Sequence, residues 1–186
     1  MLNYHEVINE ILKTRNLDSY LELGVRDPRA TFNNVQAGRK AGVDINPGSS
    51  PTFCMSTDDF FLQNKEEWDV VFIDACHETS QVTKDFENSL KCLSSNGVIV
   101  MDDINPEEEW LIGQEWCGDA WFTFANLAKQ AGLKTMAIEG TRFGLVTRGI
   151  GVYHDRDVVN EYSFLADNRV ELLNITPYSE LQSFIA

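Results

Sequence analysis

Two short apolar runs, each followed by aspartates, constrain the fold of this 186-residue chain more than any other feature. WDVVFID (68–74) and GVIVMDD (97–103) have the length and β-branched content of fully buried strands, and a segment with apolar residues at helical spacing separates them. The order strand, helix, strand is typical of a parallel sheet. The carboxyl ends of parallel strands meet at one edge, so we expect Asp74, Asp102 and Asp103 in one crevice.

The rest of the chain repeats this alternation and predicts one domain over residues 1–186. It consists of an N-terminal helix in 1–18, a core sheet over 20–150 and a C-terminal helical tail over 151–186. The expected strands are 20–25, 39–45, 51–55, 68–74 and 97–101, and a final pair at 134–140 and 143–149. The predicted fold is an α/β, Rossmann-like, doubly wound sheet with helices on both faces, mostly parallel with an antiparallel C-terminal edge hairpin.

Composition excludes several classes of protein. A formal net charge of −14 and the absence of a basic cluster disfavour nucleic-acid binding. No apolar run approaches the ~18 residues that span a bilayer, and the first residues lack the pattern of a signal peptide, so we expect a cytoplasmic protein without membrane contact. The four cysteines form no C-x-x-C pair, which argues against a zinc site or a disulfide framework. An oligomer is compatible with the sequence, which does not determine it.

The first candidate motif joins the end of one predicted strand to the end of the next. Gly24 lies at a strand-to-helix turn, and Asp44 follows 20 residues later, a spacing at which an acid can accept both hydroxyls of a ribose. The second and third glycines of G-x-G-x-x-G are missing, with Arg26 and Arg29 in their place. Alternatively, Gly24 is a tight turn and Asp44 a turn former before residues 46–47.

The second candidate motif is Ser56-Thr57-Asp58, directly after the third predicted strand. A side chain at this position can hydrogen-bond the amino group of an adenine. The same residues are also typical of a helix N-cap with acids in the first turn, and capping is the favoured single role.

The three aspartates form the third candidate site. Neighbouring strands lie ~4.8 Å apart, so Asp74 and one of Asp102 or Asp103 would have close carboxylates that repel each other. A divalent cation such as Mg²⁺ would relieve this repulsion and could leave positions open for a substrate. Alternatively, Asp102 or Asp103 caps the following turn and Asp74 is solvated in the cleft.

His77 lies three residues after Asp74 and is the candidate general base. The reference pKa of an imidazole, ~6.5, suits proton removal from a hydroxyl. The alternative is a loop residue that hydrogen-bonds the backbone.

A segment of roughly fifteen residues, 104–118, follows the acids without a clear period, and such a long connection is typical of a lid. Trp110 and Trp116 in this segment are candidates to cover a substrate, since tryptophan faces suit sugars and planar groups. Trp121 and Phe122 fit the core of the next helix equally well.

Taken together, YLELGV, GVDI, MSTDDFF, DVVFIDACH and GVIVMDDINP resemble the class I S-adenosylmethionine-dependent methyltransferases, over about residues 18–150. The resemblance is to small stand-alone methyltransferase domains with an ID-x-x-H element and an Asp-Asp pair. It implies S-adenosylmethionine as cofactor. The residues that it implies for cofactor binding are Glu22, Gly24, Asp44, Ser56, Thr57, Asp58 and Asp74.

The aspartates also resemble the metal ligands of catechol-type, sugar and antibiotic O-methyltransferases, in which a metal orients the substrate hydroxyl. This resemblance implies Asp74, Asp102 and Asp103 as ligands of Mg²⁺ or another divalent cation. The chain departs from the pattern in its single glycine at 24 and in Ala75-Cys76 before His77.

The resulting prediction is an S-adenosylmethionine-dependent methyltransferase that O-methylates a small hydroxylated, sugar-like acceptor, with metal assistance left open. Asp74, His77 and Asp102 are the predicted catalytic residues. Two alternatives stay open: an NAD-dependent oxidoreductase, which lacks the glycines that a pyrophosphate needs, and a degenerate, non-catalytic partner module.

Overall fold

The computed structural model of the chain describes residues 2–113 and 116–186, and its strands form one eight-stranded sheet. The strand order is β3-β2-β1-β4-β5-β7-β6-β8. The strands are β1 (Ser19–Leu23), β2 (Arg39–Asp44), β3 (Phe53–Cys54), β4 (Trp68–Ile73), β5 (Leu93–Met101), β6 (Leu133–Ile138), β7 (Gly144–Arg148) and β8 (Ile175–Thr176). Strands β1 to β5 pair in parallel, whereas β7 is antiparallel to β5 and β6. The predicted doubly wound, mostly parallel sheet is confirmed, and the adjacent β1 and β4 form its switch point.

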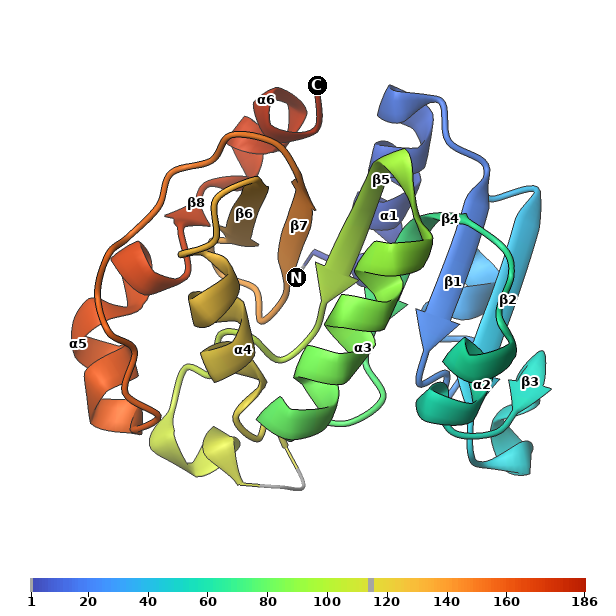
Figure 1. Ribbon diagram of the computed structural model, residues 1–186, viewed down its shortest axis with the longest axis horizontal. Helices are drawn as coiled ribbons and strands as arrows, with labels where there is room; N and C mark the ends of the chain where they lie inside the picture. Colours follow the sequence, from blue (N-terminus) through green and yellow to red (C-terminus); the bar gives the residue numbers. More distant parts are fainter. Residues whose placement is uncertain (1, 114–115) are drawn as a thin grey trace.

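Helices cover both faces of this sheet, as predicted (Figure 1). The helices are α1 (Tyr4–Arg15), α2 (Thr57–Gln63), α3 (Thr79–Cys92), α4 (Ala120–Leu127), α5 (Tyr162–Leu172) and α6 (Leu181–Ile185). Successive side chains of a strand point to opposite faces. Leu21 and Leu23 of β1 therefore join the apolar core under α2 to α5, and Tyr20 joins the core under α1 and α6.

Helix α1 forms where its apolar period predicts it. Val7, Ile8, Ile11 and Leu12 are buried on one face, against the sheet. The Glu6 carboxylate accepts a hydrogen bond from the backbone N–H of the N-cap residue at 2.9 Å, which satisfies one donor of the first turn.

The boundary between α3 and β5 differs from the prediction. The expected strand began at residue 97, after a segment with helical spacing, but α3 ends at Cys92 and Leu93 already has extended backbone. Leu93 pairs with Trp68 of β4, and the register shifts before Val70 pairs with Val98. Leu93 is therefore part of a strand pair and not of the helix, so helical spacing alone gave the wrong boundary.

The C-terminal tail also differs in part from the predicted helical segment. Val158 and Val159 precede the helix, which begins at Tyr162. After it, β8 pairs in parallel with β6 and extends the sheet by one strand beyond the β6–β7 hairpin. A two-residue strand carries no detectable sequence period, so only its tertiary contacts define it.

The connection from β1 to β2 contains a short 3-10 turn, η1 (Phe32–Asn34). Lys40 donates from its ammonium to the carbonyls of Phe32 and Val35 and fastens this segment to β2.

Candidate functional site

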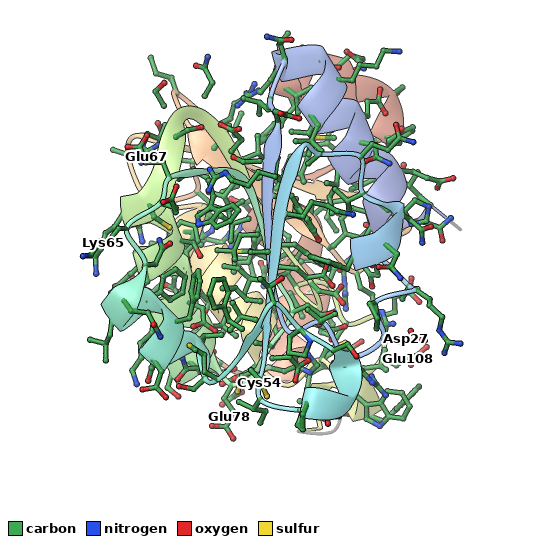
Figure 2. All side chains as sticks on the ribbon, turned by 90° about the vertical axis from the view of Figure 1, so that its right-hand side faces the viewer. Asp27, Cys54, Lys65, Glu67, Glu78 and Glu108 are labelled. Atoms are coloured by element: carbon green, nitrogen blue, oxygen red, sulfur yellow. The ribbon has the colours of Figure 1, made fainter. Side chains whose placement is uncertain are left out.

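A cleft of about 400 Å³ lies at the carboxyl ends of β1, β2, β3 and β4. Its lining residues include Gly24, Asp44, Ser56, Thr57, Asp74 and His77, which lie at or just after the ends of four strands. Figure 2 views the sheet from its β3 edge; Cys54, which ends β3, and Glu78, which precedes α3, lie at the lower end of this view. A cavity is therefore present at the switch point of the sheet, as predicted, but of the three aspartates expected in it only Asp74 is part of its lining.

Gly24 is where the connections after β1 and β4 come into contact. Its φ is +87°, and an added Cβ would lie 2.2 Å from the Asp74 carbonyl oxygen. Its N–H donates to the carbonyl of Val43 at 2.8 Å. Only glycine allows both this backbone conformation and this close approach. The tight-turn explanation of Gly24 thus holds, and the turn also forms a wall of the cleft.

Asp44 links the β1–β2 and β2–β3 connections at the mouth of the cleft. One carboxylate oxygen accepts the backbone N–H of Arg26 at 2.8 Å, and the other accepts that of Asn46 at 2.7 Å. It is therefore a turn former and at the same time a residue of the cleft. Each oxygen keeps a second lone pair, so binding to a ribose remains a prediction that this geometry permits.

Glu22 lies outside the lining of the cleft, on the same face of β1 as Tyr20. It is 2% exposed and accepts a hydrogen bond from the Tyr20 hydroxyl at 2.5 Å. Burial raises the pKa of its carboxyl to about 8, although the Tyr20 hydrogen bond acts in the other direction. A role of Glu22 toward a cofactor would therefore be indirect.

Ser56 acts as the N-cap of α2, since its hydroxyl accepts the backbone N–H of Asp59 at 3.1 Å. Ser56 and Thr57 also line the cleft. Asp58 does not belong to the lining, and its carboxylate accepts a hydrogen bond from Gln81 of α3 at 3.1 Å. The adenine contact predicted for this segment is thus open to Ser56 and Thr57.

The structure brings Asp74, His77 and Asp103 together at one end of the cleft. His77 Nε2 is 3.5 Å from an Asp74 carboxylate oxygen and 3.4 Å from an Asp103 oxygen. One ligand atom from each of the three residues lies within 4.8 Å of the others. The predicted proximity of Asp74 and Asp103 is therefore observed, with His77 between them.

The two carboxylates affect the protonation of His77, and His77 affects that of Asp74. The hydrogen bond to Asp74, together with the negative charge of Asp103, raises the pKa of His77 to about 9. Burial is the main cause of a raised pKa for Asp74, and His77 opposes it. At neutral pH, His77 is therefore an imidazolium in this arrangement and would have to lose its proton before it could act as a base.

Asp103 has a strained backbone. Its φ is +56°, a left-handed conformation that an aspartate adopts at some cost. The side chain is buried, and its second oxygen accepts a hydrogen bond from the Cys117 thiol at 3.1 Å and lies 3.8 Å from Arg142 Nε. Such strain is found mainly where the surrounding structure holds a functional residue in place.

Asp102 points away from this group, toward helix α1. One carboxylate oxygen accepts a hydrogen bond from the Tyr4 hydroxyl at 3.0 Å, and the other is buried without a partner in the described part of the chain. Burial, followed by the charges of Asp74 and Asp103, raises the pKa of Asp102 well above its ordinary value. The cluster of potential ligand atoms found in the described residues contains His77 in place of Asp102.

The segment after the acids carries two exposed tryptophans, as predicted. Trp110 and Trp116 are 60% and 51% exposed, and their rings meet edge to face at 5.4 Å. The carbonyl of Trp116 accepts a hydrogen bond from His77 Nδ1, so this segment is attached to the cluster. Trp121 is buried in the core, whereas Phe122 packs partly buried against it. Residues 114 and 115 of the predicted lid lie outside the described residues.

Sequence reasoning missed three side chains that support the acids. Tyr4 reaches Asp102 from 98 residues away, and Cys117 and Arg142 reach Asp103 from two other connections. Arg26 lines the cleft as well, at a position where the sequence suggested only a missing glycine. No local pattern announces these contacts, because each depends on how distant elements pack.

Several solved structures that are described as O-methyltransferases share this architecture. A proposed caffeoyl-CoA O-methyltransferase from Staphylococcus aureus superposes with a TM-score of 0.60 at 14% identity, over 80% of this chain and 85% of that one. An O-methyltransferase from Bacillus cereus, solved with S-adenosylhomocysteine, gives 0.57 at 13% identity over 78% and 81%. TomG, an O-methyltransferase from Streptomyces achromogenes solved with S-adenosylmethionine, gives 0.56 at 14% identity over 77% and 78%.

The sheet order, the cleft at its switch point and these superpositions define the fold of the class I S-adenosylmethionine-dependent methyltransferases. A family profile described as "Methyltransferase domain" matches residues 8–104, just over half of the chain. The protein belongs to this methyltransferase-domain family. No curated protein matches the chain. In the described residues, no helix is long and apolar enough to cross a membrane.

Proposed function

We propose that this protein transfers the methyl group of S-adenosylmethionine to a hydroxyl of a small, sugar-like acceptor, assisted by a divalent cation. The observation that carries the proposal is the position of the Asp74, His77 and Asp103 cluster at one end of the cleft. Donor and acceptor would thus meet at the end of β4 beside the acid cluster, and the methyl group would pass from the donor sulfur to the acceptor hydroxyl.

The donor fits the cleft by its shape and chemistry. S-adenosylmethionine carries no phosphate, so it does not need the second and third glycines that a dinucleotide would require. The cleft offers Asp44 for ribose hydroxyls and Ser56 and Thr57 for the adenine. The NAD-dependent alternative is not favoured by the superposed structures, among which the Bacillus cereus and Streptomyces achromogenes proteins hold S-adenosylhomocysteine and S-adenosylmethionine.

A divalent cation fits the donor set of the cluster. Two carboxylates and one imidazole are ligands that Mn²⁺ and related ions accept, and Mg²⁺ prefers the oxygens. Asp103 is buried and held in a strained conformation, and the nearby Asp102 has a buried oxygen without a partner in the described residues. Asp74, His77 and Asp103 would hold the ion, which when bound would lower the pKa of an acceptor hydroxyl.

The side chains of the protein would align donor and acceptor and handle the proton that the acceptor releases. Methyl transfer is an in-line displacement, so holding donor and acceptor in alignment supplies much of the acceleration. The exposed Trp110 and Trp116 can bind the apolar face of a sugar-like acceptor next to His77. Where no ion is bound, deprotonated His77 could take the proton that the hydroxyl releases; as a ligand of the ion it would have no free nitrogen, because Nδ1 is bonded to the carbonyl of Trp116.

Isothermal titration calorimetry tests the donor. We expect S-adenosylmethionine and S-adenosylhomocysteine to bind and NADH to give no heat. Absence of binding of both sulfur compounds at millimolar concentration would refute the proposal. Heat from NADH alone would support the oxidoreductase instead, and no heat from any of them would support a non-catalytic module.

Chelation tests the cation. Methyl transfer to an acceptor found by screening hydroxylated metabolites should stop in EDTA and return with excess Mg²⁺ or Mn²⁺. Undiminished activity in chelator would refute metal assistance and leave methyl transfer itself in place.

A further inference from the structure

Arg26 occupies a position of the first turn where a glycine would be conformationally easier. Its φ is +45°, in the left-handed region. The turn is nevertheless fixed from two sides, because the Arg26 N–H donates to Asp44 at 2.8 Å and its carbonyl accepts the Ser49 hydroxyl at 2.9 Å. A strained residue that its surroundings hold in place suggests a role for its side chain.

The side chain of Arg26 brings a positive charge into the cleft. Arg26 is exposed and lines the cavity together with Gly24 and Asp74. Arg29 pairs with Asp27 and Arg142 with Asp103, whereas Arg26 makes no ion pair within 4.0 Å in the part of the chain that the structure describes. Its charge still lowers the pKa of Asp74, which places the two groups in the same electrostatic environment.

The orientation of a bound donor follows from the other lining residues. With the adenine at Ser56 and Thr57 and the ribose at Asp44, the amino-acid end of the donor lies at Gly24, Arg26 and Asp74. That end carries an α-carboxylate and an α-ammonium group. A guanidinium and a carboxylate facing the same space complement this pair of charges, and a guanidinium binds a carboxylate with two parallel hydrogen bonds.

We propose that the Arg26 guanidinium binds the α-carboxylate of the donor and so selects S-adenosylmethionine and S-adenosylhomocysteine over nucleosides without an amino-acid end. This inference rests on the proposed function, because it assumes that the cleft holds this donor. Here the arginine takes over the part that backbone N–H groups of a fuller glycine-rich turn would play for an anionic group.

Calorimetry with two ligands isolates this contact. S-adenosylhomocysteine and 5′-methylthioadenosine share the nucleoside and an uncharged sulfur, and differ in the amino-acid end. We expect wild-type protein to prefer S-adenosylhomocysteine, and Arg26→Ala to weaken its binding about 10-fold to 100-fold while 5′-methylthioadenosine binds as before. Arg26→Lys should keep part of the preference, because lysine keeps the positive charge but cannot donate two parallel hydrogen bonds to a carboxylate.

Two further variants control for charge and folding. Arg29→Ala removes the same charge three residues away, from a side chain that is 84% exposed and paired with Asp27, and should leave both affinities unchanged. Arg26→Gly suits the left-handed backbone, so its melting temperature should equal or exceed that of the wild type while the preference is lost. This combination separates a binding role from damage to the fold.

The possible results are distinguishable. Retention of the full preference in Arg26→Ala and Arg26→Gly would overturn the inference and leave the proposed function intact. An equal loss in Arg29→Ala would also overturn it, since the effect would then be one of net charge. Failure of the wild type to bind either ligand would refute the proposed function itself.

Discussion

The two ends of the cleft are built in different ways. At the donor end, Asp44 accepts backbone N–H groups from Arg26 and Asn46, and Gly24 packs against the backbone of Asp74. At the acid end, side chains hold side chains: Tyr4 binds Asp102, and Cys117 binds Asp103. The geometry of a surface made of backbone is fixed by the path of the chain. The geometry of buried carboxylates is fixed by the distant residues that hydrogen-bond them. Substitutions at the two ends should therefore fail differently.

The largest effect is expected at the donor end, for Gly24→Ala. The new methyl group would lie 2.2 Å from the Asp74 carbonyl oxygen in a backbone with φ of +87°. Clash and strain together should lower the free energy of unfolding by about 3 kcal/mol or more and abolish binding of S-adenosylhomocysteine. Urea denaturation and calorimetry measure the two losses.

Gly132→Ala is the matched control for this substitution. Gly132 has a φ of +88°, but an added Cβ meets no atom within 4 Å. Gly132→Ala should therefore lower the free energy of unfolding by only about 1 kcal/mol, through backbone strain alone. Equal losses in the two variants would show that the contact between the β1 and β4 connections contributes nothing.

At the acid end, Asp103→Asn should affect the proposed metal more than Asp102→Asn. Asp103 lies with Asp74 and His77, whereas Asp102 binds Tyr4. We expect at least about a 100-fold loss of Mn²⁺ affinity in Asp103→Asn, since even outer residues of metal sites cost 10- to 100-fold. S-adenosylhomocysteine should bind as in the wild type. Equal Mn²⁺ titration curves for Asp103→Asn and unmodified protein would remove Asp103 from the site.

Glu22→Gln should change the pH dependence of stability. Burial raises the pKa of Glu22 to about 8, so the folded state holds a proton that the unfolded state releases near the ordinary value of 4.5. This contribution is complete below about pH 4.5 and is lost as the pH rises toward 8, at no more than about 1.4 kcal/mol per pH unit. Glutamine does not titrate, so urea unfolding of the variant should be flatter over this window. Parallel curves for both proteins would contradict the raised pKa.

The smallest effect is expected for Tyr4→Phe. It removes the hydrogen bond to Asp102 and keeps the ring that packs against Phe72 and Phe143. Loss of the hydrogen bond to this buried carboxyl should lower the free energy of unfolding by about 1–3 kcal/mol, measured by urea denaturation. The affinity for S-adenosylhomocysteine should not change. A loss of donor affinity in this variant would mean that the two ends of the cleft are coupled.

The same division separates what could be predicted from what could not. The spacing of Gly24 and Asp44, and the aspartates that follow β4 and β5, predicted a crevice at the switch point, because the ends of parallel strands converge by geometry alone. The end of α3 and the strand β8 were missed, since apolar period does not distinguish helix packing from strand pairing at Leu93 and a two-residue strand has no period.

The sequence by itself determined the fold class and placed Asp74, Asp102 and Asp103 at the ends of neighbouring strands, since apolar runs and the side-chain alternation of strands are local features of the chain. Only the tertiary structure decided how those acids are held. His77 lies between Asp74 and Asp103, Asp102 turns to Tyr4, and Arg26 enters the cleft in a strained turn. The physical reason is that the orientation and protonation of a buried carboxyl depend on the groups that hydrogen-bond it, and packing brings those groups from distant parts of the chain.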